Sequence, residues 1–217
     1  MNVKEQNFDR EQWKRYLSEQ RIDAAGRMKR EQRQLFLGAE ALLNRSLELE
    51  GIPVSLPAVY ARNPHGKPFL TAVPDLYVNW THSGTYVLCA LADHEVGIDI
   101  QCAKQEPKDS LVNRVLQPEE MLFYNRTDRE RKTRLFYEYW TLKESYLKAL
   151  GTGFHTSLNT FFIQMEGMYP EIVQRDGKSA YTVRILDFAE EEYAAAFCME
   201  GQYEDMEKYA KIKYIVI

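Results

Sequence analysis

Residues 140–151 read Trp-Thr-Leu-Lys-Glu-Ser-Tyr-Leu-Lys-Ala-Leu-Gly and close a block of helix-forming residues that begins at Pro118. Trp140, Glu144 and Lys148 are spaced four residues apart, so on a helix they form one row. That row is bordered by apolar side chains at Phe136, Tyr139, Leu147 and Leu150. Glu144 is therefore expected at the border of a core, where a carboxylate needs a partner. The alternative is a Glu144–Lys148 surface ion pair worth about 0.3 kcal/mol.

The two halves of the chain repeat one order, in which helices are followed by strands. In the first half, helical patterns at residues 12–27 and 29–49 precede strand patterns at residues 76–80, 86–92 and 96–101. In the second half, the helical block 118–150 and glycines at 151 and 153 precede strand patterns at residues 161–165, 181–187, 193–199 and 211–217. Short breaks between the first three strands favour an antiparallel meander. The order predicts an α+β fold, with a weak internal duplication into two similar α+β subdomains.

The composition indicates a globular chain. The 28 Lys and Arg against 32 Asp and Glu give a net charge of −4, and 45% of the residues are hydrophobic, which suffices for a packed interior. Cys89, Cys102 and Cys198 lie far apart without a CxxC pair, so we expect neither a disulfide framework nor a cysteine-rich zinc site, and a reducing cytoplasm fits best. With neither a run of 18 apolar residues nor a signal-peptide core, we expect no membrane span and no export by that route.

A candidate metal-binding strand lies at residues 97–101, Gly-Ile-Asp-Ile-Gln. Alternation along a strand points Asp99 and Gln101 to one face. Two oxygen donors on one face suit a hard cation such as Mg²⁺ shared with substrate phosphates, rather than zinc. The alternative is an ordinary strand end with one exposed carboxylate.

Three further segments suit an anion. Residues 79–84, Asn-Trp-Thr-His-Ser-Gly, place an imidazole and two hydroxyls at a strand-to-strand turn, and Lys67 lies in a Gly-Lys-Pro loop. Residues 27–33 gather four cations against one carboxylate, with Arg21 just upstream. For each loop the alternative is a solvated turn that satisfies its own polar groups.

Read in this order, the motifs HGKP (65–68), NWTHSG (79–84), GIDIQ (97–101) and WTLKESYLKALG (140–151) resemble the Sfp-type 4'-phosphopantetheinyl transferases. The resemblance spans about residues 63–153 and is weaker over the N-terminal helices. It implies transfer of the phosphopantetheine arm of coenzyme A to a serine of an acyl or peptidyl carrier protein, releasing adenosine 3',5'-bisphosphate, in fatty acid, polyketide or nonribosomal peptide synthesis. It also implies a monomer with coenzyme A and Mg²⁺ (Mn²⁺ as a substitute) between subdomains at residues 1–100, the coenzyme A side, and 101–217, the metal and carrier side.

The resemblance further implies roles for single residues. The metal ligands are expected to be Asp99, Gln101 and Glu144, and the catalytic residues Glu144, Lys143 and Asp99, with Glu144 as the base. The coenzyme A contacts are expected to be Arg21, Arg27, Lys29, Arg30, Arg33, Lys67, Thr81, His82, Ser83, Lys143 and Lys148. Many relatives have glutamate at the position of Gln101, so weaker metal binding is expected here.

The segment after the GID strand is expected to dock the carrier, because carriers of this family present an acidic helix beside their serine. Its contacts are predicted at Lys104, Leu111, Val112, Arg114, Val115 and Leu116, with Lys108 adding charge.

Two other classes of protein remain as alternatives. A hydrolase built from Ser83, His82 and Asp99 lacks a GxSxG elbow. A non-enzymatic nucleic-acid-binding module using residues 27–33 lacks interleaved aromatic residues and a basic overall charge.

Overall fold

A computed structural model of the chain describes residues 1–4, 6–9, 11–152, 156–188 and 190–201. The first half contains helices α1 (Glu11–Lys14), α2 (Glu19–Ala25) and α3 (Arg30–Leu49) and strands β1 (Tyr60–Arg62), β2 (Pro68–Leu70), β3 (Tyr77–Ser83), β4 (Tyr86–Ala92) and β5 (Val96–Cys102). The second half contains helices α4 (Asp109–Val115), α5 (Pro118–Arg126) and α6 (Arg129–Leu150), the 3-10 turn η2 (Leu158–Thr160) and strands β6 (Phe161–Gln164), β7 (Glu171–Gln174), β8 (Gly177–Lys178), β9 (Tyr181–Ile185) and β10 (Tyr193–Glu200).

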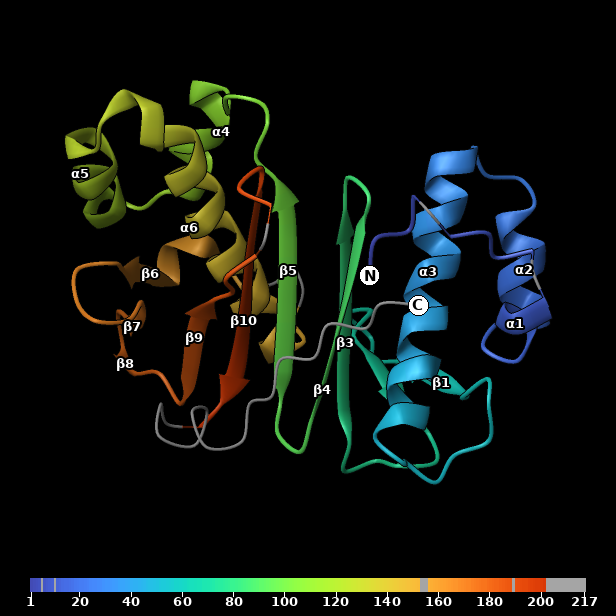
Figure 1. The fold of residues 1–217 in the computed structure, drawn as a ribbon. Helices are drawn as coiled ribbons and strands as arrows, with labels where there is room; N and C mark the ends of the chain where they lie inside the picture. The colour runs from blue at the N-terminus through green and yellow to red at the C-terminus, as the bar shows by residue number, and fades with distance from the viewer. Residues whose placement is uncertain (5, 10, 153–155, 189, 202–217) are drawn as a thin grey trace.

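Each half of the molecule packs one long helix against antiparallel strands, which confirms the α+β class. In Figure 1, α3 covers the β3–β4 hairpin on one side of the molecule and α6 covers the sheet β5–β10–β9 on the other. Core residues of the first half include Leu37, Leu42, Leu43 and Leu47 of α3. Core residues of the second half include Phe136, Tyr139, Leu142 and Tyr146 of α6. The long helices therefore carry the apolar faces that hold each half together.

The expected three-stranded meander is wrong in its third strand. β3 and β4 form the predicted hairpin, but β5 pairs with β10 in antiparallel register, with Asp99 opposite Ala196. β5 therefore belongs to the sheet of the second half and lies beside the hairpin of the first half (Figure 1). Local sequence pattern could not show this, because the partner strand lies about ninety residues further along the chain.

Two predicted helical blocks are each interrupted. The block at residues 12–27 splits into α1 and α2, since the Ser18 side chain caps α2 by accepting a hydrogen bond from the Arg21 backbone N–H. The block at residues 118–150 splits into α5 and α6 around Thr127 and Asp128. The strand pattern at residues 211–217 lies outside the described residues. In the described part of the chain, no helix combines the length and the apolar character needed to cross a membrane.

Candidate active site

A cavity of about 270 Å³ lies between the two halves. The first half contributes the loop that joins β1 to β2 and part of β3, and the second half contributes the C-terminal turns of α6. The lining residues are Arg62, His65, Gly66, Lys67, Pro68, Asn79, Trp80, Glu144, Leu147, Lys148 and Gly151. Glu144 and Lys148 thus lie where the predicted row on the helix put them, facing a shared space.

Gly97 allows β5 to lie directly on α6. A Cβ atom at this position would lie 2.0 Å from the Ser145 carbonyl oxygen and 2.4 Å from the Ala149 backbone nitrogen. Both distances are far below van der Waals contact, so the close approach requires glycine. The approach brings Asp99, two residues further along β5, next to Lys148 of α6.

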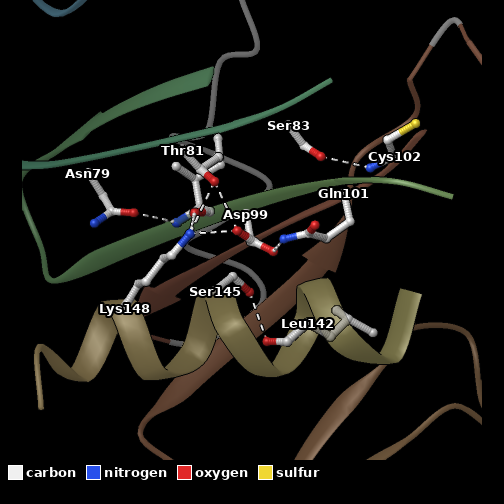
Figure 2. A network of polar contacts seen from close by, with 10 residues as sticks. Asn79, Thr81, Ser83, Asp99, Gln101, Cys102, Leu142, Ser145 and Lys148 are labelled. Carbon is white, nitrogen blue, oxygen red and sulfur yellow. Dashed lines mark hydrogen bonds and ion pairs between the residues drawn. The ribbon is translucent and has the colours of Figure 1, made fainter. Parts of the chain in front are cut away.

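Asp99 is the centre of a buried polar network, shown in Figure 2. The Lys148 ammonium donates to Asp99 Oδ1 at 2.5 Å, to the Thr81 hydroxyl at 3.1 Å and to the Ile98 carbonyl at 3.1 Å. The Thr81 hydroxyl donates to Asp99 Oδ1 at 2.9 Å, and the Gln101 amide donates to Oδ2 at 3.1 Å. Because Asp99 is 2% exposed, this pairing is what makes its burial tolerable.

β3 joins β5 through side chains instead of a backbone ladder. Asn79 Oδ1 accepts from the Ile98 N–H at 3.0 Å, and Ser83 Oγ accepts from the Cys102 N–H at 2.9 Å. Together with Thr81, these residues alternate along β3 and face β5, as Figure 2 shows. The role of Asn79 was missed, although the alternation of polar residues in NWTHSG is a signal for it. Coenzyme A contacts of Thr81 and Ser83 stay a prediction.

His82 lies between these residues in sequence and is exposed, outside the lining of the cavity. Its pKa is lowered, chiefly because neighbouring protein atoms displace water and also because Lys148 is positively charged. Neighbouring positions on a strand point to opposite faces, so Ser83 and His82 do not form the nucleophile and base of the hydrolase alternative.

Glu144 is half-buried, and its carboxylate has no hydrogen bond or ion pair within the described part of the chain. Burial raises its pKa, the charge of Asp99 raises it further, and the charge of Lys148 partly opposes both. A carboxylate with a raised pKa that lines a cavity is suited to accept a proton or to bind a cation.

Of the three predicted metal ligands, only Glu144 lines the cavity, while Asp99 affects the Glu144 carboxylate through its charge and Gln101 donates to Asp99. Among the described residues, no group of three or more His, Cys, Asp and Glu side chains could hold a metal ion. Two carboxylates and an amide suit a hard cation that retains several waters, which describes Mg²⁺. The unpartnered Glu144 carboxylate is the observation that makes this donor set fit such an ion.

Lys143 does not face the cavity, which corrects its predicted contact with coenzyme A phosphates. Its ammonium is 1% exposed, pairs with Glu120 at 2.7 Å and donates to the Val115 carbonyl at 2.9 Å. Burial lowers the pKa of Lys143 and raises that of Glu120, in each case against the effect of the partner's charge. The reason is helix geometry, because one residue turns the side chain about 100° from Glu144 and into the core of the second half.

The sequence predicted that the N-terminal cations contact coenzyme A, but none of them lines the cavity between the two halves. The Arg21 guanidinium donates twice to the Phe36 carbonyl and once to the hydroxyl of Tyr60, whose ring packs on Trp80, a lining residue of the cavity. Arg33 instead pairs with Asp9 at 2.6 Å. A second, polar hollow of about 440 Å³ is lined by Lys4, Gln6, Asn7, Asp9, Arg30, Arg33 and Gln34. Of the five N-terminal cations predicted to contact coenzyme A, Arg27 and Lys29 are exposed and line neither hollow.

Two lining residues were missed. The Arg62 guanidinium donates to the Gly66 carbonyl at 2.7 Å and stands over the Trp80 ring, 5.6 Å from its centre. Two features of the sequence could have indicated them. An arginine lies before the Asn-Pro-His-Gly turn, and a tryptophan lies within NWTHSG. His65, set aside as a loop residue, also lines the cavity.

The predicted carrier-docking segment is corrected in its apolar part. Val112, Val115 and Leu116 are buried in the core of the second half, and Leu111 packs against it. The exposed residues of the segment are the cations Lys104, Lys108 and Arg114, the acids Glu106 and Asp109, and the polar residues Gln105, Ser110 and Asn113. The apolar spacing was that of an amphipathic helix covering its own core.

Comparison with known proteins finds similarity to one family. Residues 95–198 match the sequence profile of the 4'-phosphopantetheinyl transferase superfamily. This segment of the chain is similar to that superfamily. It contains the Asp99, Gln101, Glu144 and Lys148 of the site, whereas the superfamily segment excludes Lys67 and Thr81, which lie earlier in the chain.

Two relatives and one solved structure are similar to parts of this chain. A 4'-phosphopantetheinyl transferase of Bacillus subtilis is 33% identical over 62% of this chain and 59% of its own length. The transferase gsp of Aneurinibacillus migulanus is 30% identical over 58% of this chain and 52% of its own length. The match thus spans between half and three fifths of these relatives. The crystal structure of the Thermotoga maritima holo-[acyl-carrier-protein] synthase superposes with a TM-score of 0.42 at 18% identity, covering 57% of this chain and 78% of the synthase.

Proposed function

We propose that the protein transfers the 4'-phosphopantetheine group of coenzyme A to a serine of an acyl or peptidyl carrier protein and releases adenosine 3',5'-bisphosphate. One observation carries the proposal: Asp99 from β5 and Glu144 from α6 interact electrostatically beside a cavity lined by the cations Arg62, Lys67 and Lys148. A pyrophosphate-bearing substrate needs such a combination of acidic metal ligands and fixed cations.

Mg²⁺ is the proposed metal, held by Asp99, Glu144 and, directly or through water, by Gln101. When bound, the ion would neutralise charge on the pyrophosphate of coenzyme A. Lys148 already donates to Asp99, so it is placed to contact both the metal-binding carboxylate and a phosphate oxygen. Arg62 and Lys67 are further cations in the lining of the cavity.

Glu144 is the proposed general base. The serine oxygen forms a bond to the phosphorus that carries the pantetheine arm, the bond from that phosphorus to the bridging oxygen breaks, and adenosine 3',5'-bisphosphate leaves with that oxygen. The serine proton passes to the Glu144 carboxylate, directly or through water.

The carrier is proposed to approach the surface that presents Lys104, Lys108 and Arg114. These three cations are exposed after β5, together with the acids Glu106 and Asp109. The cations outnumber the acids in this segment, so an acidic partner would be attracted to it. Lys104 pairs with Glu192 at 2.6 Å, and both side chains are more than half exposed, so this weak pair can exchange for a carrier carboxylate. The pathway served, the monomeric state and a cytoplasmic location stay predictions.

Intact-mass measurement of purified apo carrier proteins tests the proposal. Incubation with the protein, coenzyme A and Mg²⁺ is expected to add one phosphopantetheine to a carrier, and a carrier whose acceptor serine is replaced by alanine serves as the control. The carrier proteins tested come from fatty acid, polyketide and peptide synthesis. If none of them gains this mass, the proposed reaction is wrong.

A further inference from the structure

Lys67 already has an anionic partner inside the protein. Its side chain is 10% exposed, and its ammonium pairs with the Glu95 carboxylate and donates to the Ala149 carbonyl at 2.6 Å. An ammonium has three N–H donors, so these two partners leave one for a ligand. Lys67 thus lines the cavity, but the Glu95 carboxylate largely neutralises its positive charge before any phosphate enters.

The position of Glu95 is fixed by the fold. It directly precedes β5, and its carbonyl accepts from the Glu200 backbone N–H of β10 at 2.9 Å. The loop that carries Lys67 is fixed as well, because the Asn63 amide donates to the Gly151 carbonyl at 2.9 Å. The carboxylate and the ammonium therefore face each other across the junction of the two halves, and neither backbone has to move to keep them paired.

A phosphate entering the cavity competes with this internal carboxylate. It must share the Lys67 ammonium with Glu95, and it must approach the negative charge of the Glu95 carboxylate, whose side chain is 34% exposed. Both effects weaken the binding of an anion without changing the shape of the cavity.

We propose that Glu95 is an affinity-setting residue, which competes with phosphate-bearing ligands for Lys67 and so lowers the affinity of the cavity for them. The inference rests on the proposed function for the identity of the ligand, coenzyme A. It predicts that the protein binds phosphates less tightly than its cations alone would allow.

Isothermal titration of the Glu95→Gln variant tests this role. Glutamine has the size of glutamate and can still accept a hydrogen bond from Lys67, so the lysine stays oriented while the competing charge is removed. We expect the Kd for coenzyme A and for inorganic pyrophosphate to fall roughly fivefold, as expected for the loss of a partly buried ion pair. The Kd for pantetheine, which carries no phosphate, is expected to stay unchanged.

The gain must depend on Lys67. In a Lys67→Met background, Glu95→Gln is expected to change pyrophosphate affinity by less than in the parent protein, and a double-mutant cycle measures the difference. Glu119→Gln is the matched control. It removes an equal charge from Glu119 of α5, which forms an exposed ion pair with Arg175 and does not line the cavity.

The outcomes separate this inference from the function on which it rests. Failure of the parent protein to bind coenzyme A would count against the proposed function. An unchanged or weakened pyrophosphate affinity in Glu95→Gln, or an equal gain in the Lys67→Met background, would overturn the role of Glu95.

Discussion

The Glu144 carboxylate lines the cavity and makes no hydrogen bond or ion pair within the part of the chain that the structure describes. Its pKa is raised in the folded protein, so the native state binds a proton more tightly than the unfolded chain. Stability therefore rises as the pH falls from the folded-state pKa toward the ordinary glutamate value, and above the folded-state pKa the ionised carboxylate lowers stability. Such a cost is typical of a residue kept for chemistry or cation binding.

The metal-free protein should reveal this cost. In the presence of a chelator at neutral pH, Glu144→Gln is expected to be more stable than the parent protein, and the difference should shrink as the pH is lowered through the raised pKa. Urea denaturation over a series of pH values measures it. A difference that does not vary with pH would show that the Glu144 charge is not the cause.

Lys143, the neighbour of Glu144 in sequence, is expected to act on stability alone. Lys143→Met leaves the Glu120 carboxylate buried without its charged partner, so a loss of about 3 kcal/mol is expected. Coenzyme A affinity should be retained in the folded variant. Lys104→Met, which breaks an exposed pair, should cost less than about 1 kcal/mol. Equal stability of the two variants, or a selective loss of coenzyme A affinity in Lys143→Met, would restore the original assignment of Lys143.

At the scale of elements, local pattern explains what could be predicted and what could not. Four-residue spacing on α6 placed Glu144 and Lys148 correctly, because helix geometry fixes which side chains share a face. The partner of β5 could not be predicted, since alternation gives the faces of a strand and not its neighbour. The burial of Val112 and Val115 was missed because an amphipathic helix has the same sequence pattern whether its apolar face meets its own core or a partner.

The contact between β5 and α6 depends on Gly97. Gly97→Ala places a methyl group against the backbone of Ser145 and Ala149, so we expect destabilisation of about 3 kcal/mol and weaker coenzyme A binding, because the contact sets the distance between the two carboxylates. Thermal denaturation and titration calorimetry check both effects. Gly177→Ala is the control, as its Cβ would meet no atom within 4 Å. Similar melting temperatures for the two variants would refute the packing argument.

On the scale of the whole molecule, the proposed carrier-docking cations at α4 lie in a different part of the protein from the cations at the end of α1. Figure 1 shows α4 and α1 at opposite ends of the molecule. Lys108→Glu with Arg114→Glu, at α4, is expected to slow carrier modification at low salt while leaving coenzyme A affinity unchanged. Lys14→Glu with Arg15→Glu, at the end of α1, makes the same charge change and should have little effect. Initial rates of carrier modification at two ionic strengths compare the pairs, and equal rates would place the docking surface elsewhere.

Residues of both halves build the site. Asp99 accepts hydrogen bonds from Thr81 of the first half and Lys148 of the second, so neither half alone supplies both partners. We propose that phosphopantetheine is transferred at this junction through Asp99 and Glu144. The most direct measurement is the intact mass of an apo carrier after incubation with coenzyme A and either the parent protein or Glu144→Gln, with Mg²⁺ or with EDTA. We predict one added phosphopantetheine with the parent protein and Mg²⁺, a rate lower by roughly 100-fold or more with Glu144→Gln, and no transfer in EDTA. Near-normal transfer by Glu144→Gln, or transfer that is indifferent to EDTA, would contradict the account.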